Sequence, residues 1–186
     1  MKSIWFIQAF YQIKTMHKRI ETLGYFFIII FTLHLGSYND FLINNFSDLI
    51  SQKNILVYIW SLITSFYTCY QLKKVTDFTI TKLFIIFIIL NLVIFTPYDL
   101  IIYPTLSFIH IIIAYLAFII LLGITIYYVY FSFNKIIKIY FVSYILILIS
   151  LFVNFGYINS LFEIVFTIGL ITGLKLYIYK IEKNKN

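Results

Sequence analysis

The chain has 186 residues, of which 62% are apolar and only 11% are charged, and its mean hydropathy is +0.98. Soluble domains average about 25% charged residues, so this chain has too little polar surface to cover a globule in water. Its apolar runs approach twenty residues, which is the length of a membrane helix rather than of a barrel strand. The sequence therefore predicts an all-α, polytopic membrane helix bundle embedded in a lipid bilayer.

The charge and the cysteine count exclude several other classes. The net charge is +7, but in a membrane protein the placement of charges matters more than their sum, and no nucleic-acid partner is predicted. The single cysteine, Cys69, excludes an internal disulfide framework. No Cys/His cluster of metal-binding spacing is present, so neither a metal nor a cofactor is predicted.

Residues 1–19 have the pattern of an amphipathic helix lying in the membrane interface. A signal peptide is the alternative, but Lys14, Lys18 and Arg19 follow the apolar patch, and no small-residue cleavage site appears. An uncleaved interfacial helix is therefore expected. One face carries Gln8, Gln12, Thr15 and Arg19, and the other carries Trp5, Phe6, Ala9, Phe10, Ile13 and Met16.

Six apolar segments follow, and together they predict one membrane domain over 1–186. Each is about long enough to cross ~30 Å of hydrocarbon at ~1.5 Å per residue. The third is the shortest, and Lys82 near its start would have to extend back to the interface. The segments run over about 20–36, 54–72, 80–95, 106–131, 139–155 and 160–179.

The basic residues predict the orientation. With six spans, 13 of the 14 Lys and Arg residues fall on one side of the membrane, and only Lys53 falls on the other. Cytoplasmic loops carry an excess of Lys and Arg. Both termini are therefore expected in the cytoplasm, in a bacterial-type inner membrane.

The longest connection is predicted to form a short amphipathic helix on the outer surface. It spans residues 37–53, and it carries Leu42, Phe46, Leu49 and Ile50 at helical spacing with polar residues between them.

Six ionisable side chains are expected near the outer side, namely His34, Asp40, Asp48, Asp99, His110 and Glu163. An ionisable group in a membrane segment is costly unless it is paired or hydrated, and it is a functional candidate by default. The pattern favours an outward-facing polar pocket, for which the candidate lining residues are His34, Asp48, Asp99, His110 and Glu163. The alternative is a set of structural residues in the wet interface, where a helix N-terminus would also favour Glu163.

Other residues indicate helix packing. Asn91 in the third segment needs an interhelical partner, and Gly169 and Gly173 form a GxxxG pattern in the sixth. The GxxxG leaves open whether its partner is another helix of this chain, which is the default, or another subunit of a homo-oligomer or membrane complex.

No catalytic motif is present, so the sequence does not decide whether the chain is an enzyme. There is no phosphate-binding loop, GxSxG or HExxH. A haem held by His34 and His110 is a further hypothesis, because the two histidines lie at matched depth and bis-histidine ligation is common.

The order of features resembles a group of bacterial six-helix membrane proteins that are related in outline to the Frag/DRAM/Sfk type. The similar elements are 46–49 (Phe-Ser-Asp-Leu), 96–99 (Thr-Pro-Tyr-Asp), and His110 followed by Ala114, Ala117 and Phe118. The resemblance covers roughly 20–131, although Ile50 stands where a glycine is expected. It implies a special status for Asp48, Pro97, Asp99 and His110, and a role in lipid handling or regulation.

The function predicted from these observations is the binding or modulation of a lipid or small amphiphile in the outer pocket. One alternative is a small subunit of a respiratory or transport complex. The other is a membrane enzyme or haem carrier that uses His34 and His110.

Overall fold

The computed structural model describes residues 2–38, 42, 45–52, 54–130 and 134–185, and within these it has seven helices and no strand. The all-α prediction is confirmed for this part of the chain. The helices are α1 (Lys2–Ser37), α2 (Phe46–Ser51), α3 (Ile55–Val75), α4 (Ile80–Phe95), α5 (Pro104–Tyr130), α6 (Lys135–Phe155) and α7 (Ser160–Lys185).

Five of the described helices are long and apolar enough to cross a membrane. The sixth predicted span, α4, has 16 residues, which is a length of about 24 Å at ~1.5 Å per residue and is short of the ~30 Å hydrocarbon layer. A total of six spans therefore stays a prediction. The five long stretches are Thr15–Ser37, Ile55–Val75, Pro104–Tyr127, Lys135–Phe155 and Ser160–Lys183.

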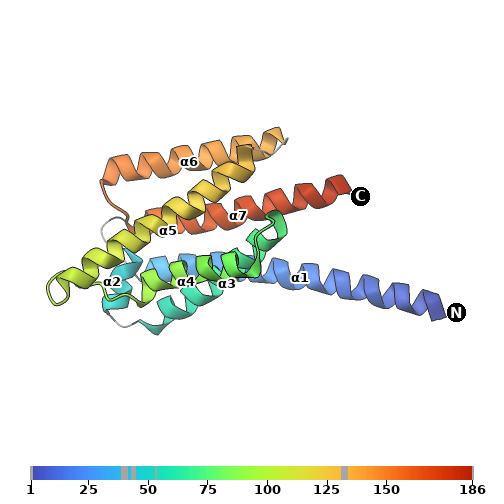
Figure 1. The fold of residues 1–186 in the computed structure, drawn as a ribbon, viewed down its shortest axis with the longest axis horizontal. Helices are drawn as coiled ribbons and strands as arrows, with labels where there is room; N and C mark the ends of the chain where they lie inside the picture. Colours follow the sequence, from blue (N-terminus) through green and yellow to red (C-terminus); the bar gives the residue numbers. More distant parts are fainter. Residues whose placement is uncertain (1, 39–41, 43–44, 53, 131–133, 186) are drawn as a thin grey trace.

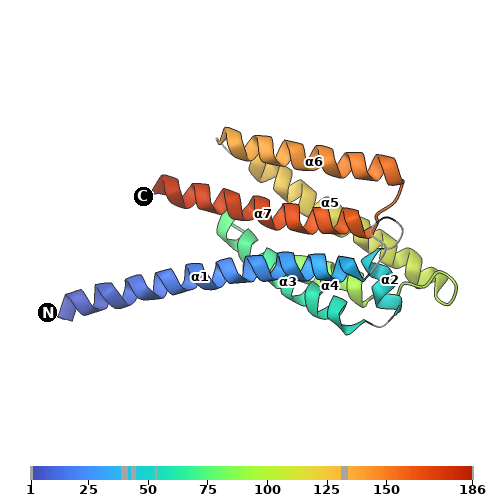
Figure 2. The same cartoon turned by 180° about the vertical axis from the view of Figure 1, so that it is seen from behind.

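The N-terminal segment is not a separate helix, which corrects that part of the prediction. α1 runs without interruption from Lys2 to Ser37, because no proline lies in this stretch to break its hydrogen bonds. Its first part extends past the other helices (Figures 1 and 2). The placement of residues 1–19 in the membrane interface stays a prediction.

The five long helices and α4 form a closed ring. In order around the ring, α1 packs on α3, α3 on α4, α4 on α5, α5 on α6, α6 on α7, and α7 on α1. α3 and α7 also contact each other across the ring. Both chain termini project from one end (Figure 1), called here the terminal end. The opposite end holds α2, residues 96–103 and residues 156–159, and it is called the α2 end.

The helix α2 is buried in the bundle rather than lying on its surface, which corrects the sequence prediction. Phe46 and Leu49 are each 1% exposed, and the Phe46 ring meets the Trp60 ring of α3 edge-on at 4.9 Å. Asn45 starts the helix: its side chain accepts from the Asp48 N–H, while the Asp48 carboxylate accepts from the Asn45 N–H. Leu42, which the same pattern included, is exposed.

The three packing residues all contact neighbouring helices of this chain. The Asn91 Oδ1 accepts from the Ser61 hydroxyl at 3.1 Å, which joins α4 to α3. A methyl group on Gly169 would overlap the Tyr144 ring, and one on Gly173 would overlap the Phe141 ring. Tyr144 cannot withdraw freely, because its hydroxyl donates to the Phe166 carbonyl at 2.8 Å. The GxxxG pattern thus lets α7 approach the aromatic face of α6.

We expect Gly169→Ala to lower the free energy of unfolding by about 1–3 kcal/mol, the usual cost of overpacking. The matched control is Gly123→Ala in α5, where an added methyl would meet no atom within 4 Å. Thermal unfolding of both variants in the same detergent measures the difference. Equal midpoints for the two variants would contradict the close approach of α6 and α7.

Candidate functional site

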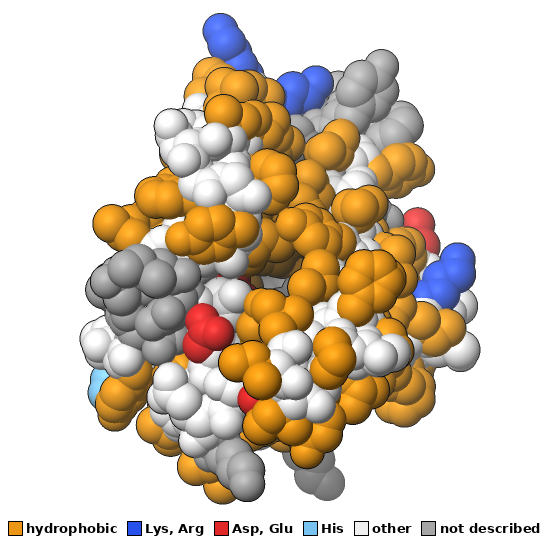
Figure 3. Space-filling view, turned by 90° about the vertical axis from the view of Figure 1, so that its left-hand side faces the viewer, with side chains coloured by type: hydrophobic (Ala, Val, Ile, Leu, Met, Phe, Trp, Pro, Cys, Tyr) orange, Lys and Arg blue, Asp and Glu red, His pale blue; other side chains and the backbone are white. Residues whose placement is uncertain are grey.

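A cavity of about 420 Å³ opens at the α2 end of the bundle. Figure 3 views this end and shows it hollowed, with acidic side chains near the hollow. Tyr115 and Tyr157 line the cavity and are 38% and 44% exposed, so it reaches the protein surface. The other polar lining residues are Asn45, Ser47, Asp48, Tyr98, His110 and Glu163, and the apolar ones are Val93, Ile111, Ala114 and Ile158.

Both ring nitrogens of His110 are engaged by the protein. The His110 Nδ1 lies 3.1 Å from the Thr96 carbonyl oxygen, which can only accept, so Nδ1 carries a hydrogen. The His110 Nε2 lies 2.7 Å from the Ser47 hydroxyl, which donates to it when the ring is neutral. The side chain is 2% exposed. His110 therefore connects α5 to α2 and to the end of α4.

Glu163 connects α7 to the start of α2. Its Oε2 accepts from the Phe46 N–H at 2.6 Å, and this N–H belongs to the first turn of a helix, where it has no intrahelical partner. The Asp48 carboxylate lies in the same cavity and accepts from the Asn45 N–H at 2.7 Å. Two carboxylates thus share one cavity, each fixed by a backbone donor.

Asp99 organises its own loop and does not line the cavity. Its Oδ1 accepts from the N–H groups of Ile101 and Ile102, both at 2.9 Å. Its own N–H donates to the Ser107 hydroxyl at 2.8 Å, which ties the loop to the first turn of α5. Pro104 occupies the first position of that helix, where a proline needs no N–H.

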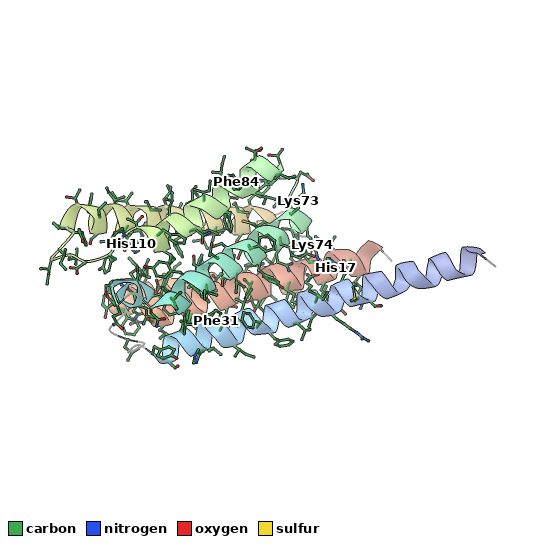
Figure 4. The ribbon with its side chains drawn as sticks, turned by 90° about the horizontal axis from the view of Figure 1, so that it is seen from below. His17, Phe31, Lys73, Lys74, Phe84 and His110 are labelled. Atoms are coloured by element: carbon green, nitrogen blue, oxygen red, sulfur yellow. The ribbon has the colours of Figure 1, made fainter. Side chains whose placement is uncertain are left out.

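His34 lies apart from the other candidates. It is an exposed residue of α1, and its Nε2 lies 3.3 Å from the Tyr38 hydroxyl. α1 and α5 lie on opposite sides of the bundle (Figure 4). Since both His110 nitrogens are also engaged, a haem between His34 and His110 does not fit this arrangement. Asp40 falls outside the described residues.

The cavity therefore brings together three of the five candidate residues, namely Asp48, His110 and Glu163. No group of three His, Cys, Asp or Glu side chains in the described part of the chain is arranged to hold a metal ion.

A second, apolar cavity of about 150 Å³ lies between α3, α4, α5 and α7. It shares Val93, Ala114, Ile158 and Glu163 with the first cavity, so the two cavities meet at these four residues. The Thr64 hydroxyl on its wall is buried and has no protein hydrogen-bond partner. The deeper lining includes Trp60, Ala117, Phe118, Leu121 and Phe166.

Tyr98 lines the cavity from the loop between α4 and α5. Burial raises the pKa of its phenol, and the nearby Asp48 carboxylate raises it further, against a hydrogen bond with the Asn45 side chain. The phenol is therefore protonated at neutral pH. Its ring lies 5.1 Å from the His110 ring, so Tyr98 presents a hydrogen-bond donor and an aromatic face.

Removing the Ser47 hydroxyl should leave the buried His110 Nε2 without its partner. We expect Ser47→Ala to lower the free energy of unfolding by about 1–3 kcal/mol, the cost of a buried unsatisfied polar group. The control is Ser51→Ala in the same helix, where an exposed hydroxyl donates to the Asp48 carbonyl. Chemical unfolding in detergent measures both, and an equal loss in the two would argue against a stabilising link between Ser47 and His110.

A second polar cluster, missed by the sequence analysis, lies toward the terminal end. The Glu21 Oε2 of α1 forms an ion pair with the Lys74 Nζ of α3 at 2.5 Å, and its Oε1 accepts from the Gln71 amide at 3.0 Å. The Lys175 Nζ of α7 is buried 4.2 Å from the centre of the Tyr25 ring. Figure 4 shows Lys74 and His17 far from His110. An acid inside an apolar segment was the signal that could have identified Glu21.

The Glu21 ion pair should contribute to stability. We expect Glu21→Gln to cost about 1–3 kcal/mol, because it leaves the Lys74 ammonium without its carboxylate in a partly buried position. The control is Glu182→Gln, which removes an exposed pair with Lys18 and should have a much smaller effect. Unfolding midpoints in detergent measure the stability of both variants. Equal midpoints would show that the Glu21 ion pair contributes no more to stability than the exposed pair of Glu182.

No protein-family model matches the chain, and no curated protein or solved structure is found to be similar to it. The resemblance to the Frag/DRAM/Sfk type therefore stays a proposal. The length and hydropathy of the helices define the class: the chain is a multi-pass α-helical membrane protein.

Proposed function

We propose that this membrane protein binds a lipid or small amphiphile in the cavity at the α2 end. The observation that carries the proposal is the meeting of a polar cavity of about 420 Å³ with an apolar cavity of about 150 Å³ at Glu163. A molecule with a polar head and an apolar chain could place its head in the polar cavity and its chain in the apolar one. Ligand sites are usually concave, about 300–1,000 Å³ in volume, and mostly apolar with a few placed polar groups.

His110 and Glu163 are the proposed head-group residues, together with Asp48 and the Tyr98 phenol. Their backbone and side-chain partners hold them at fixed positions, which lowers the cost of ordering them when a ligand binds. The resemblance to the Frag/DRAM/Sfk type, whose members are associated with lipid handling, is a second reason for the proposal.

The proposal includes six spans with both termini in the cytoplasm of a bacterial-type cell. The described Lys and Arg residues belong to the N-terminal half of α1, the 73–82 region, the start of α6 and the end of α7. These segments lie toward the terminal end (Figures 1 and 2), and the positive-inside rule places such an end in the cytoplasm. The α2-end cavity then faces outward.

The test of binding uses a side chain that blocks the junction of the two cavities. Ala114 lines both of them, so Ala114→Leu should reduce the amphiphile that co-purifies with the protein by about tenfold, as expected for a loss of ~1.4 kcal/mol. Native mass spectrometry and extraction of bound lipid measure it. His110→Ala and Glu163→Gln should reduce the same species.

The control is Gly123→Leu, which adds similar bulk to α5 where an added Cβ meets no neighbouring atom. It should retain the bound species. If Ala114→Leu, His110→Ala and Glu163→Gln all retain it at the native level, the cavity is not the binding site. A protein that purifies only within a larger stable assembly would instead favour the subunit alternative.

A further inference from the structure

We propose that the ligand of this cavity is a single-chain amphiphile with a positively charged ammonium head. The inference rests on the proposed function and narrows it to one class of molecule. The argument uses the charges around the cavity, the rings that line it, and the size of the apolar chamber behind it.

The charged groups that line the cavity are all acidic. Asp48 and Glu163 face it from α2 and α7, and no Lys or Arg of the described chain lines it. The His110 ring adds no positive charge in its neutral form, in which Nδ1 donates to Thr96 and Nε2 accepts from Ser47. Asp99 follows Tyr98 in the chain, but its carboxylate accepts hydrogen bonds from backbone N–H groups of its own loop.

The two acidic side chains favour a cation over an anionic group. Asp48 and Glu163 line the same cavity from two different helices, so an ammonium bound between them would be stabilised by both acidic groups. An anionic head group would face two acidic side chains in a partly buried site. Electrostatic complementarity therefore favours an ammonium and disfavours a carboxylate or phosphate.

The aromatic lining suits the same head group. The rings of Tyr98, Tyr115 and Tyr157 border the cavity, and an ammonium is attracted to the face of an aromatic ring within about 6 Å. The terminal end already shows such a contact, with the Lys175 ammonium 4.2 Å from the centre of the Tyr25 ring.

The apolar chamber limits the chain. Its volume is about 150 Å³ and its lining is mostly apolar, which suits one short alkyl chain that passes Ala114. The geometry thus favours a small alkylammonium with a single chain.

The experiment compares three probes that are each built on a six-carbon chain, namely hexyltrimethylammonium, hexanoate and hexan-1-ol. The protein carries Trp5→Phe, so that Trp60, which lines the apolar chamber, is its one remaining tryptophan. In nanodiscs, hexyltrimethylammonium should change the Trp60 emission saturably, with an affinity at least about tenfold above that of hexanoate. Empty nanodiscs correct for partitioning, and calorimetry on the unmodified protein checks the affinities.

Glu163→Gln and Asp48→Asn should each lower the affinity for hexyltrimethylammonium by about tenfold and should change the affinity for hexan-1-ol little. The controls are Asp77→Asn and Glu182→Gln, which remove acids outside the cavity lining. Both should leave the affinity for hexyltrimethylammonium unchanged. Unaltered Trp60 emission before titration verifies that each variant is folded.

Two results would overturn the inference and leave amphiphile binding intact: hexanoate or hexan-1-ol binding as tightly as the ammonium, or unchanged ammonium binding in both acid variants. If none of the three probes binds saturably while Ala114→Leu still removes a co-purified species, the short-chain assignment is wrong. If no probe binds and no species co-purifies, the proposed function itself fails.

Discussion

The hydrogen bond from the Phe46 N–H to the Glu163 carboxylate joins α2 to α7 across 117 residues of sequence. A helix of six residues is far too short to be stable by itself, so α2 depends on such tertiary contacts. Once docked, it buries Phe46 and Leu49 against Trp60 and closes part of the bundle end. Glu163 is also one of the four residues that line both the polar and the apolar cavity. The Glu163 side chain therefore both anchors α2 and contributes an acidic group to the cavity lining.

The positions of the long helices could be predicted because each is an apolar run bounded by polar or turn-forming residues. Two details could not be predicted. The amphipathic pattern of residues 1–19 indicates which face is apolar, but it does not reveal that the helix continues into α1. The apolar spacing at Phe46, Leu49 and Ile50 predicts a helix, but its burial depends on Trp60 and Ile164, which lie on other helices.

The depth of each candidate residue in the membrane could be predicted from the sequence, but its position around the helix bundle could not. Distance from a helix end can be read from the sequence, and it placed His34 and His110 at one level. Position around the bundle cannot be read in this way, and α1 and α5 lie on opposite sides of it (Figure 4). Asp99 was expected in the pocket because its carboxylate could not be assigned to its own loop without coordinates. Glu21 was not predicted as a site residue, because the sequence does not show that Gln71 and Lys74 of α3 lie beside it.

The contact of α3 with α7 across the ring affects how the protein is made. α7 is translated after the helices that it joins, and it contributes Glu163 to both cavities and Lys175 to the terminal-end cluster. Before α7 inserts, α2 lacks its anchor, and the cavity lacks one wall. The cavity at the α2 end is therefore complete only after α7 has packed against the other helices.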